Sequence, residues 1–290
     1  MAASAVTVVN AMTVDVEDYF HVAALAKSID KSQWSDMEYR VEGSTRRLLD
    51  LFDRQGIHAT FFVLGWVARR SPELIREIHR RGHEVASHGM SHDLVYNQTP
   101  QIFAAETRES KALLEDIIGA PVLGYRASTY SITKRSLWAL DILKEAGFLY
   151  DSSIFPIHHD KYGIPDAKQV PALIQTPKGA SIVEFPMSTA PYFGLRMPVC
   201  GGGYFRLLPF WLTRAGLYKL NHTLRRPFIF YLHPWEIDHG QPRINASMLS
   251  RFRHYTNIDK CEARLIRLMQ HFRFGRVRDV LRDASLLSVS

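Results

Sequence analysis

The sequence predicts a single α/β domain of alternating strands and helices, most simply a closed or nearly closed barrel. Three observations support this prediction. The chain has 290 residues, enough for one large domain with a buried core. Short apolar runs alternate with segments that carry helix start and stop signals, as in parallel βα units. No GxGxxG or phosphate-binding loop follows any apolar run, so an open doubly wound sheet is the less favoured alternative.

The first half of the chain contains three predicted strand–helix units. The first two strands are runs rich in valine, phenylalanine or other apolar residues, at residues 6–16 and 59–64, and the third is the short segment 83–87 that follows Gly82. Each helix follows a capping Ser or Thr, twice with a proline in the first turn; the expected ranges are 44–56, 71–82 and 99–118. The polar stretch 19–42 is expected to be a loop with short helical pieces.

The second half continues the alternation with longer connections. The expected strands are residues 121–125, 148–150, 182–186 and 228–232, and the expected helices are 133–146, about 209–220 and a basic C-terminal region, about 256–284. Residues about 154–181 are rich in proline and glycine and longer than a simple connector needs. We expect this insertion to form one wall of a substrate groove within a single domain that spans residues 1–290.

Composition and charge exclude several classes of protein. The two cysteines, Cys200 and Cys261, form no CxxC pattern, which argues against a thiolate metal site or a disulfide framework. The N-terminus lacks the pattern of a signal peptide, and no run of about 18 apolar residues occurs, so a cytoplasmic protein is expected. From Arg251 onward nine Lys or Arg face four Asp or Glu, a large part of the net charge of +7. This basic helical region could touch an anionic membrane surface, although a solvated helix face is the simpler interpretation. No motif supports nucleic-acid binding.

Four short polar motifs follow apolar runs. They are Asp15-Val-Glu17-Asp18, His88-Gly-Met-Ser-His92, Tyr125-Arg126 and Tyr231-Leu232-His233. Side chains at the C-terminal ends of parallel barrel strands gather in one mouth, so these four motifs are expected to meet. Together they indicate a mononuclear metal hydrolase.

Two imidazoles four residues apart can converge on one ion if the segment makes a helical turn, and a carboxylate commonly completes such a site. Asp15 and Glu17 point to the same side of an extended strand, whereas Asp18 points oppositely unless the strand has already ended. One carboxylate can therefore bind the metal while another stays free as a base. Because no Glu stands at position 89, this is not the HExxH helix of zinc proteases.

In their order and content these motifs resemble the polysaccharide deacetylase family, carbohydrate esterase family four. Asp15-Val-Glu17-Asp18-Tyr-Phe, Gly124-Tyr-Arg126, Tyr150-Asp151-Ser-Ser and His233-Pro-Trp-Glu236 resemble in particular the branch associated with bacterial exopolysaccharide and exosortase loci. The resemblance implies a distorted (β/α)7-type barrel and spans nearly the whole chain. One departure is that no proline follows Arg126-Ala127.

The resemblance also implies the role of each site residue. Asp15 would be the general base, Arg126 would orient it, and His233 would be the general acid. His88 and His92 would bind a divalent metal, commonly zinc, with Glu17 as the third ligand and Asp18 as the alternative. The family also leads us to expect a carboxylate beside His233, for which the candidates are Asp151, Glu184 and Glu236.

The expected substrate is the N-acetylhexosamine of a bacterial polysaccharide or of its lipid-linked precursor. Trp235, Tyr130 and Tyr192 present ring faces that could stack on sugars, although core packing explains them equally well. Two other functions stay open at this point: an allantoinase-like hydrolase of non-sugar amides on the same scaffold, and a glycan-binding protein with a degenerate site.

Overall fold

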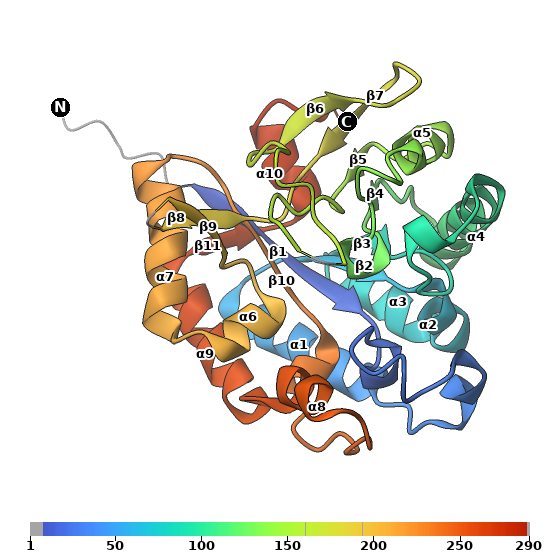
Figure 1. The fold of residues 1–290 in the computed structure, drawn as a ribbon, viewed down its shortest axis with the longest axis vertical. Helices are drawn as coiled ribbons and strands as arrows, with labels where there is room; N and C mark the ends of the chain where they lie inside the picture. The colour runs from blue at the N-terminus through green and yellow to red at the C-terminus, as the bar shows by residue number, and fades with distance from the viewer. Residues whose placement is uncertain (1–7, 160, 193, 289–290) are drawn as a thin grey trace.

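The computed structural model describes residues 8–159, 161–192 and 194–288, and its centre is a mostly parallel sheet (Figure 1). Seven neighbouring strands run parallel in the order β10-β1-β2-β3-β4-β5-β7. Their bounds are β1 Val9–Val16, β2 Thr60–Val63, β3 Glu84–Ser87, β4 Gly124–Tyr125, β5 Tyr150–Asp151, β7 Ser181–Glu184 and β10 Ile229–Leu232. Four further strands were not predicted or were predicted as helix or loop. β6 (Ala172–Gln175) pairs antiparallel with β7, β11 (Arg273–Gly275) pairs with β1, and β8 (Thr189–Tyr192) forms a hairpin with β9 (Leu195–Pro198).

The two ends of the parallel array approach each other through segments beside the strands. Ile229 N of β10 donates to Ser188 Oγ, which follows β7. Gly201 forms a parallel bridge with Tyr231, and a Cβ at this glycine would lie 1.8 Å from the Tyr231 carbonyl oxygen. A side chain at position 201 would therefore prevent this close approach. The sheet curls into the distorted barrel that the sequence predicts.

Helices cover the outside of the sheet (Figure 1). The α-helices are α1 Val41–Gln55, α2 Gly65–Arg70, α3 Pro72–Arg80, α4 Pro100–Ile118, α5 Trp138–Glu145, α6 Gly202–Leu207, α7 Phe210–Tyr218, α8 Met248–Tyr255, α9 Ile258–His271 and α10 Val277–Asp283. Short helical turns occupy η1 Tyr19–His21, η2 Lys31–Asp36, η3 Val95–Asn97, η4 Ser128–Tyr130, η5 Lys219–Thr223 and η6 Pro234–Ile237.

Two predicted helix starts were wrong. α1 begins at Val41 rather than at a Ser44 cap, because the carboxylate of Asp18 accepts hydrogen bonds from the backbone N–H groups of Arg40 and Val41. α5 begins at Trp138, five residues after the predicted cap Thr133, because that region first makes turns held by Ser136. The helix α2 was missed because it is a single short segment between two stronger signals.

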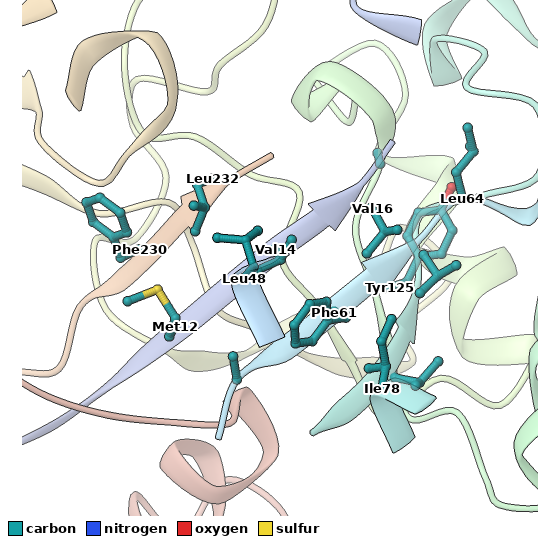
Figure 2. Packing of buried hydrophobic residues seen from close by; sticks show 14 of the residues in the cluster. Met12, Val14, Val16, Leu48, Phe61, Leu64, Ile78, Tyr125, Phe230 and Leu232 are labelled. Atoms are coloured by element: carbon teal, nitrogen blue, oxygen red, sulfur yellow. The ribbon is translucent and has the colours of Figure 1, made fainter. Parts of the chain in front are cut away.

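Side chains alternate along β1 between an outer and an inner layer of core. Met12, Val14 and Val16 pack outward with Phe61 of β2 and Leu48 of α1 (Figure 2). The barrel interior is lined by a second apolar cluster that includes Ala11, Phe62, Ala86, Val183 and Ile229. Because alternate residues face opposite sides of a strand, Thr13 and Asp15 lie on the inner side with this second cluster. The strand thus carries Asp15 into the barrel mouth while its neighbours bury apolar surface.

The C-terminal region consists of two helices separated by β11, rather than one continuous helical region. The apolar face of α9 is buried in the core; its members are Ile258, Cys261, Leu265 and Leu268. Among the described residues, no helix combines the length and the apolar character needed to cross a bilayer. Val6 and Thr7, with which the first predicted strand begins, lie outside the described residues.

Candidate metal centre and active site

The structure brings Glu17, His88 and His92 together. One donor atom from each side chain lies within 4.8 Å of the other two. Glu17 Oε2 is 2.5 Å from His92 Nε2 and 4.0 Å from His88 Nε2. His92 adopts a left-handed backbone with φ of 58°, so the segment after β3 turns sharply and returns the second imidazole toward the first. Two imidazoles and one carboxylate form a donor set that suits a single Zn²⁺ or similar divalent ion with a further position left open.

The protonation of these groups also suits a metal. Burial lowers the pKa of His88 to about 4, so its imidazole is neutral at pH 7. Its Nδ1 lies 2.8 Å from the carbonyl oxygen of Arg126 and donates to it, which leaves the lone pair on Nε2 facing Glu17. Burial alone would raise the pKa of Glu17, but His92, His233 and His88 hold it well below its usual range. Among the described residues, the buried Glu17 Oε2 accepts no hydrogen bond of normal geometry, so an ion would satisfy it.

Asp18, the alternative ligand, lies outside this group. Its two carboxylate oxygens accept hydrogen bonds from the backbone N–H groups of Tyr19, Arg40 and Val41. The strand ends at Val16, and the chain then turns so that Asp18 caps η1 and the start of α1. The structure therefore favours Glu17 over Asp18 as the third metal ligand. The Asp18 carboxylate instead connects the loop after β1 to the start of α1.

Asp15 and Arg126 form a buried ion pair beside the metal-ligand group. Arg126 Nη1 donates to Asp15 Oδ1 at 2.6 Å and to Thr13 Oγ1 at 2.8 Å. The guanidinium is wholly buried, packs over the Phe62 ring at 4.0 Å and donates further to Ser152. An isolated buried charge would be expensive, so the pairing compensates both charges and fixes the two side chains.

The loop after Arg126 is held without the proline of the family pattern. Ala127 N donates to Ser153 Oγ, which in turn donates to Asp151 Oδ1. The next turn places Thr129 and Tyr130 at φ of 54° and 52°, two adjacent non-glycine residues in the left-handed region. Such strain is costly and gathers at functional sites, and Thr129 lines the cavity described below.

His233 faces the carboxylates from the end of β10. Its Nε2 is 3.6 Å from Glu17 Oε1 and 3.9 Å from Asp15 Oδ2. Its Nδ1 lies 2.7 Å from Glu236 Oε1, so among the three carboxylates that the sequence left open, Glu236 is the partner. Burial alone would lower the pKa of His233, but the hydrogen bond with Glu236 and the charges of Glu17, Glu236 and Asp15 raise it to about 9.

Glu236 is itself held by Arg206, a buried residue of α6 that sequence reasoning missed. Arg206 Nε donates to Glu236 Oε2 at 2.7 Å, and its other nitrogens donate to the carbonyl oxygens of Arg253, His254 and Thr256. No strand-end motif marked this arginine, because it reaches the site from a helix.

The other two candidate carboxylates contact the segment just after β5, where Ser152 accepts hydrogen bonds from Arg126. Asp151 and Glu184 are buried neighbours on paired strands, and burial raises the pKa of each. Asp151 accepts from Ser153 Oγ and Glu184 from Ile154 N, so both brace the strand ends near the arginine. Neither contacts His233.

These groups open into one cavity of about 450 Å³. Its lining includes Asp15, Glu17, His88, His92 and His233. His159, Lys161 and Tyr162 of the loop-rich insertion also line it; whether this cavity is the substrate groove stays a prediction. Tyr130 and Trp235 line the cavity too, and the imidazoles of His233 and His254 stack on Trp235. Tyr192 is not part of this lining, because its hydroxyl donates to the Leu212 carbonyl oxygen beside α7.

Comparison with known families assigns both halves of the chain. Residues 30–150 match the model described as "Polysaccharide deacetylase", and residues 152–282 match "Domain of unknown function (DUF3473)". The chain thus contains a polysaccharide deacetylase domain followed by a DUF3473 segment, a pair that is typical of the exopolysaccharide-associated branch of that family. Strands from both matched segments share the one sheet, since Tyr150 of β5 pairs with Val183 of β7, and β2 and β10 lie on either side of β1.

Individual proteins with similar sequences or structures are also deacetylases or share their fold. A chitooligosaccharide deacetylase of Rhizobium leguminosarum bv. trifolii is 29% identical over 118 residues, which cover 39% of this chain and 49% of that protein. The chain spans less than half the length of the first curated relatives it matches. A putative polysaccharide deacetylase from Mycobacterium smegmatis has the same fold, with a TM-score of 0.66, 20% identity and coverage of 99% and 94% of the two chains. PuuE allantoinase shares the fold at a TM-score of 0.59 and 17% identity, with coverage of 95% and 89%.

Proposed function

We propose that this chain is a metal-dependent amide hydrolase that removes N-acetyl groups from N-acetylhexosamine units of a bacterial polysaccharide or of its lipid-linked precursor. One observation carries the proposal: a carboxylate–arginine pair and a histidine–carboxylate pair face the Glu17, His88 and His92 group in a single cavity. The match of residues 30–150 to the polysaccharide deacetylase model supports a sugar substrate, and the chitooligosaccharide deacetylase relative supports an acetylated hexosamine.

Glu17, His88 and His92 would hold one divalent ion, for which zinc is the expected choice given two imidazoles and one carboxylate. When bound, such an ion lowers the pKa of a coordinated water and polarises the amide oxygen. The chain's own residues supply the proton transfers and the orientation of the substrate.

Asp15 is proposed as the general base that takes a proton from the attacking water. Its Oδ1 is held by Arg126, which leaves Oδ2 toward the cavity and His233. His233 is proposed as the general acid that protonates the departing amine nitrogen, and Glu236 fixes its ring through Nδ1. A backbone N–H near Thr129 is proposed to stabilise the oxyanion, because the strained turn presents this segment to the cavity.

Acetate release from N-acetylglucosamine oligomers tests the proposal. The wild-type chain should release acetate, lose this activity after chelation and regain it when zinc or another divalent ion returns. Opening of a ureide ring without acetate release would instead support an allantoinase-like hydrolase. Binding of the oligomers with no turnover under any metal would support a glycan-binding protein.

A further inference from the structure

The helix α8 exposes its largest apolar side chains to solvent. Met248 is 88% exposed, Leu249 57% and Phe252 56%. Large apolar side chains that protrude together are unusual on a soluble surface, where isolated ones are common. The three residues, called here the α8 apolar face, lie within two helical turns.

The position of each residue around the helix makes this a coherent face. At about 100° per residue, Met248, Phe252 and Leu249 fall within an arc of about 100°. His254, the buried residue of α8, lies on the opposite side, where it donates from Nε2 to Gln241 and stacks on Trp235. The helix is thus anchored by one side and presents a purely apolar surface on the other.

Arginines border the α8 apolar face. Arg251 and Arg253 fall on the two flanks of the apolar arc by the same helical spacing. Residues 239–257 contain three arginines and no Asp or Glu. Within the part of the chain that the structure describes, neither Arg251 nor Arg253 has a carboxylate within 4.0 Å. Apolar side chains flanked by unpaired arginines fit the boundary between acyl chains and anionic headgroups of a bilayer.

The helix also stands at the mouth of the active site. Figure 1 places α8 at the end of the sheet toward which the β1 and β10 arrows point. Arg253 and His254 line the same cavity as His233 and Glu17. A surface that binds α8 would therefore lie beside the entrance through which the substrate enters.

We infer that α8 docks the protein onto a bilayer that carries anionic phospholipids, with Met248, Leu249 and Phe252 entering the headgroup region and Arg251 and Arg253 contacting phosphates. The basic helix α9 is a weaker candidate for membrane docking, because its apolar face is already buried in the core of the protein. A second copy of the chain is also a weaker candidate, because three side chains fall well short of the ~800 Å² per partner of a stable interface. The docking of α8 on a membrane is independent of the proposed function. The further statement that docking brings the cavity to a lipid-linked glycan rests on the proposed function.

Co-sedimentation with vesicles tests the inference without any turnover. The wild-type chain should bind vesicles of equal parts phosphatidylglycerol and phosphatidylcholine at least about tenfold more strongly than vesicles of phosphatidylcholine alone. Added salt should weaken this binding. The double variant Leu249→Asp/Phe252→Asp should bind at least about tenfold more weakly, and Arg251→Gln should weaken binding to the anionic vesicles alone.

Leu173→Asp is the matched control, because Leu173 is 55% exposed and belongs to β6, the edge strand that Figure 1 shows far from α8. This variant should bind vesicles like the wild type. Acetate release from soluble oligomers by the double variant should equal that of the wild type, which shows that the fold and the site are intact.

If neither protein releases acetate but the vesicle results hold, the proposed function fails and the docking surface stands. Equal vesicle binding by wild type and double variant, no wild-type binding, or a wild-type dimer that the double variant dissociates would overturn the inference.

Discussion

The substitution Glu236→Gln tests the contribution of the Glu236 charge, because it removes the charge and nearly preserves the shape of the side chain. The carboxylate bridges His233 Nδ1 and Arg206 Nε, each at 2.7 Å. Burial alone would raise the pKa of Glu236, but Arg206 and His233 lower it to about 2, so the group is ionised at pH 7. Glutamine keeps an oxygen that can accept from His233 but removes the negative charge.

The catalytic effect follows from the pKa of His233. Burial alone would lower this pKa, and Glu236 contributes both a hydrogen bond and a charge to the interactions that raise it to about 9. Removing the charge should lower the pKa of His233 by at least about 1, equivalent to about 1.4 kcal/mol. A general acid acts only when protonated, so activity is lost as the pH rises through its pKa. The basic limb of the kcat/KM profile should therefore move to lower pH in the variant.

The substitution should also cost stability, because Arg206 would stay buried without its counter-charge. Breaking a buried ion pair on one side costs about 3–5 kcal/mol, and the lower end applies here since Arg206 keeps its bonds to three carbonyl oxygens. Urea unfolding of the two proteins measures this loss.

The matched control is Glu84→Gln. Glu84 is also buried, but its carboxylate accepts hydrogen bonds from neutral donors only, Thr60 Oγ1, the Tyr150 hydroxyl and the Arg278 backbone N–H, so the substitution leaves no buried charge without its partner and should cost less. Glu84 is not among the residues that line the active-site cavity. If Glu236→Gln leaves both the pH profile and the unfolding free energy unchanged, or if Glu84→Gln moves the pH profile equally, the reasoning about this pair is refuted.

Three further outcomes are expected. Asp15→Asn should bind metal like the wild type but lose at least about 10²-fold in kcat, and full activity would remove Asp15 as the base. His254 has a pKa lowered to about 3 by burial and by Arg206, so the folded state binds fewer protons than the unfolded state between pH 3 and 6.5. Stability should fall by about 2 kcal/mol from pH 6.5 to pH 5, and an equal slope in His254→Phe would contradict this. Ser153→Ala removes the acceptor for Ala127 N and should lower kcat by loosening the loop after Arg126, while melting temperature checks that the fold persists.

The strands were largely predictable because their signals are local. Apolar runs such as residues 59–64 and 228–232 contain β2 and β10, which are buried on both faces, and a strand buried on both sides needs a continuous apolar run. β11 was hidden within a predicted helical region, because its three residues are fixed by pairing with β1 rather than by their own pattern. The start of α1 was also fixed by a distant group, the Asp18 carboxylate.

The sequence predicted those site residues that belong to motifs at the ends of strands. Glu17, His88, His92, Asp15 and Arg126 meet as those motifs indicate. The choice between Glu17 and Asp18 needed the geometry, since both follow the same strand and differ only in where the chain turns. Arg206 could not be predicted, because its partner Glu236 lies 30 residues away in the sequence and no local pattern couples them.

The central claim is that Glu17, His88 and His92 hold one divalent ion, and metal content after dialysis against zinc measures it most directly. The wild type should retain one equivalent of zinc per chain, and His88→Ala should retain much less. His83→Ala, which removes a buried imidazole that is not among the cavity-lining residues, should retain zinc like the wild type. Full zinc retention by His88→Ala, or none by the wild type, would contradict the account.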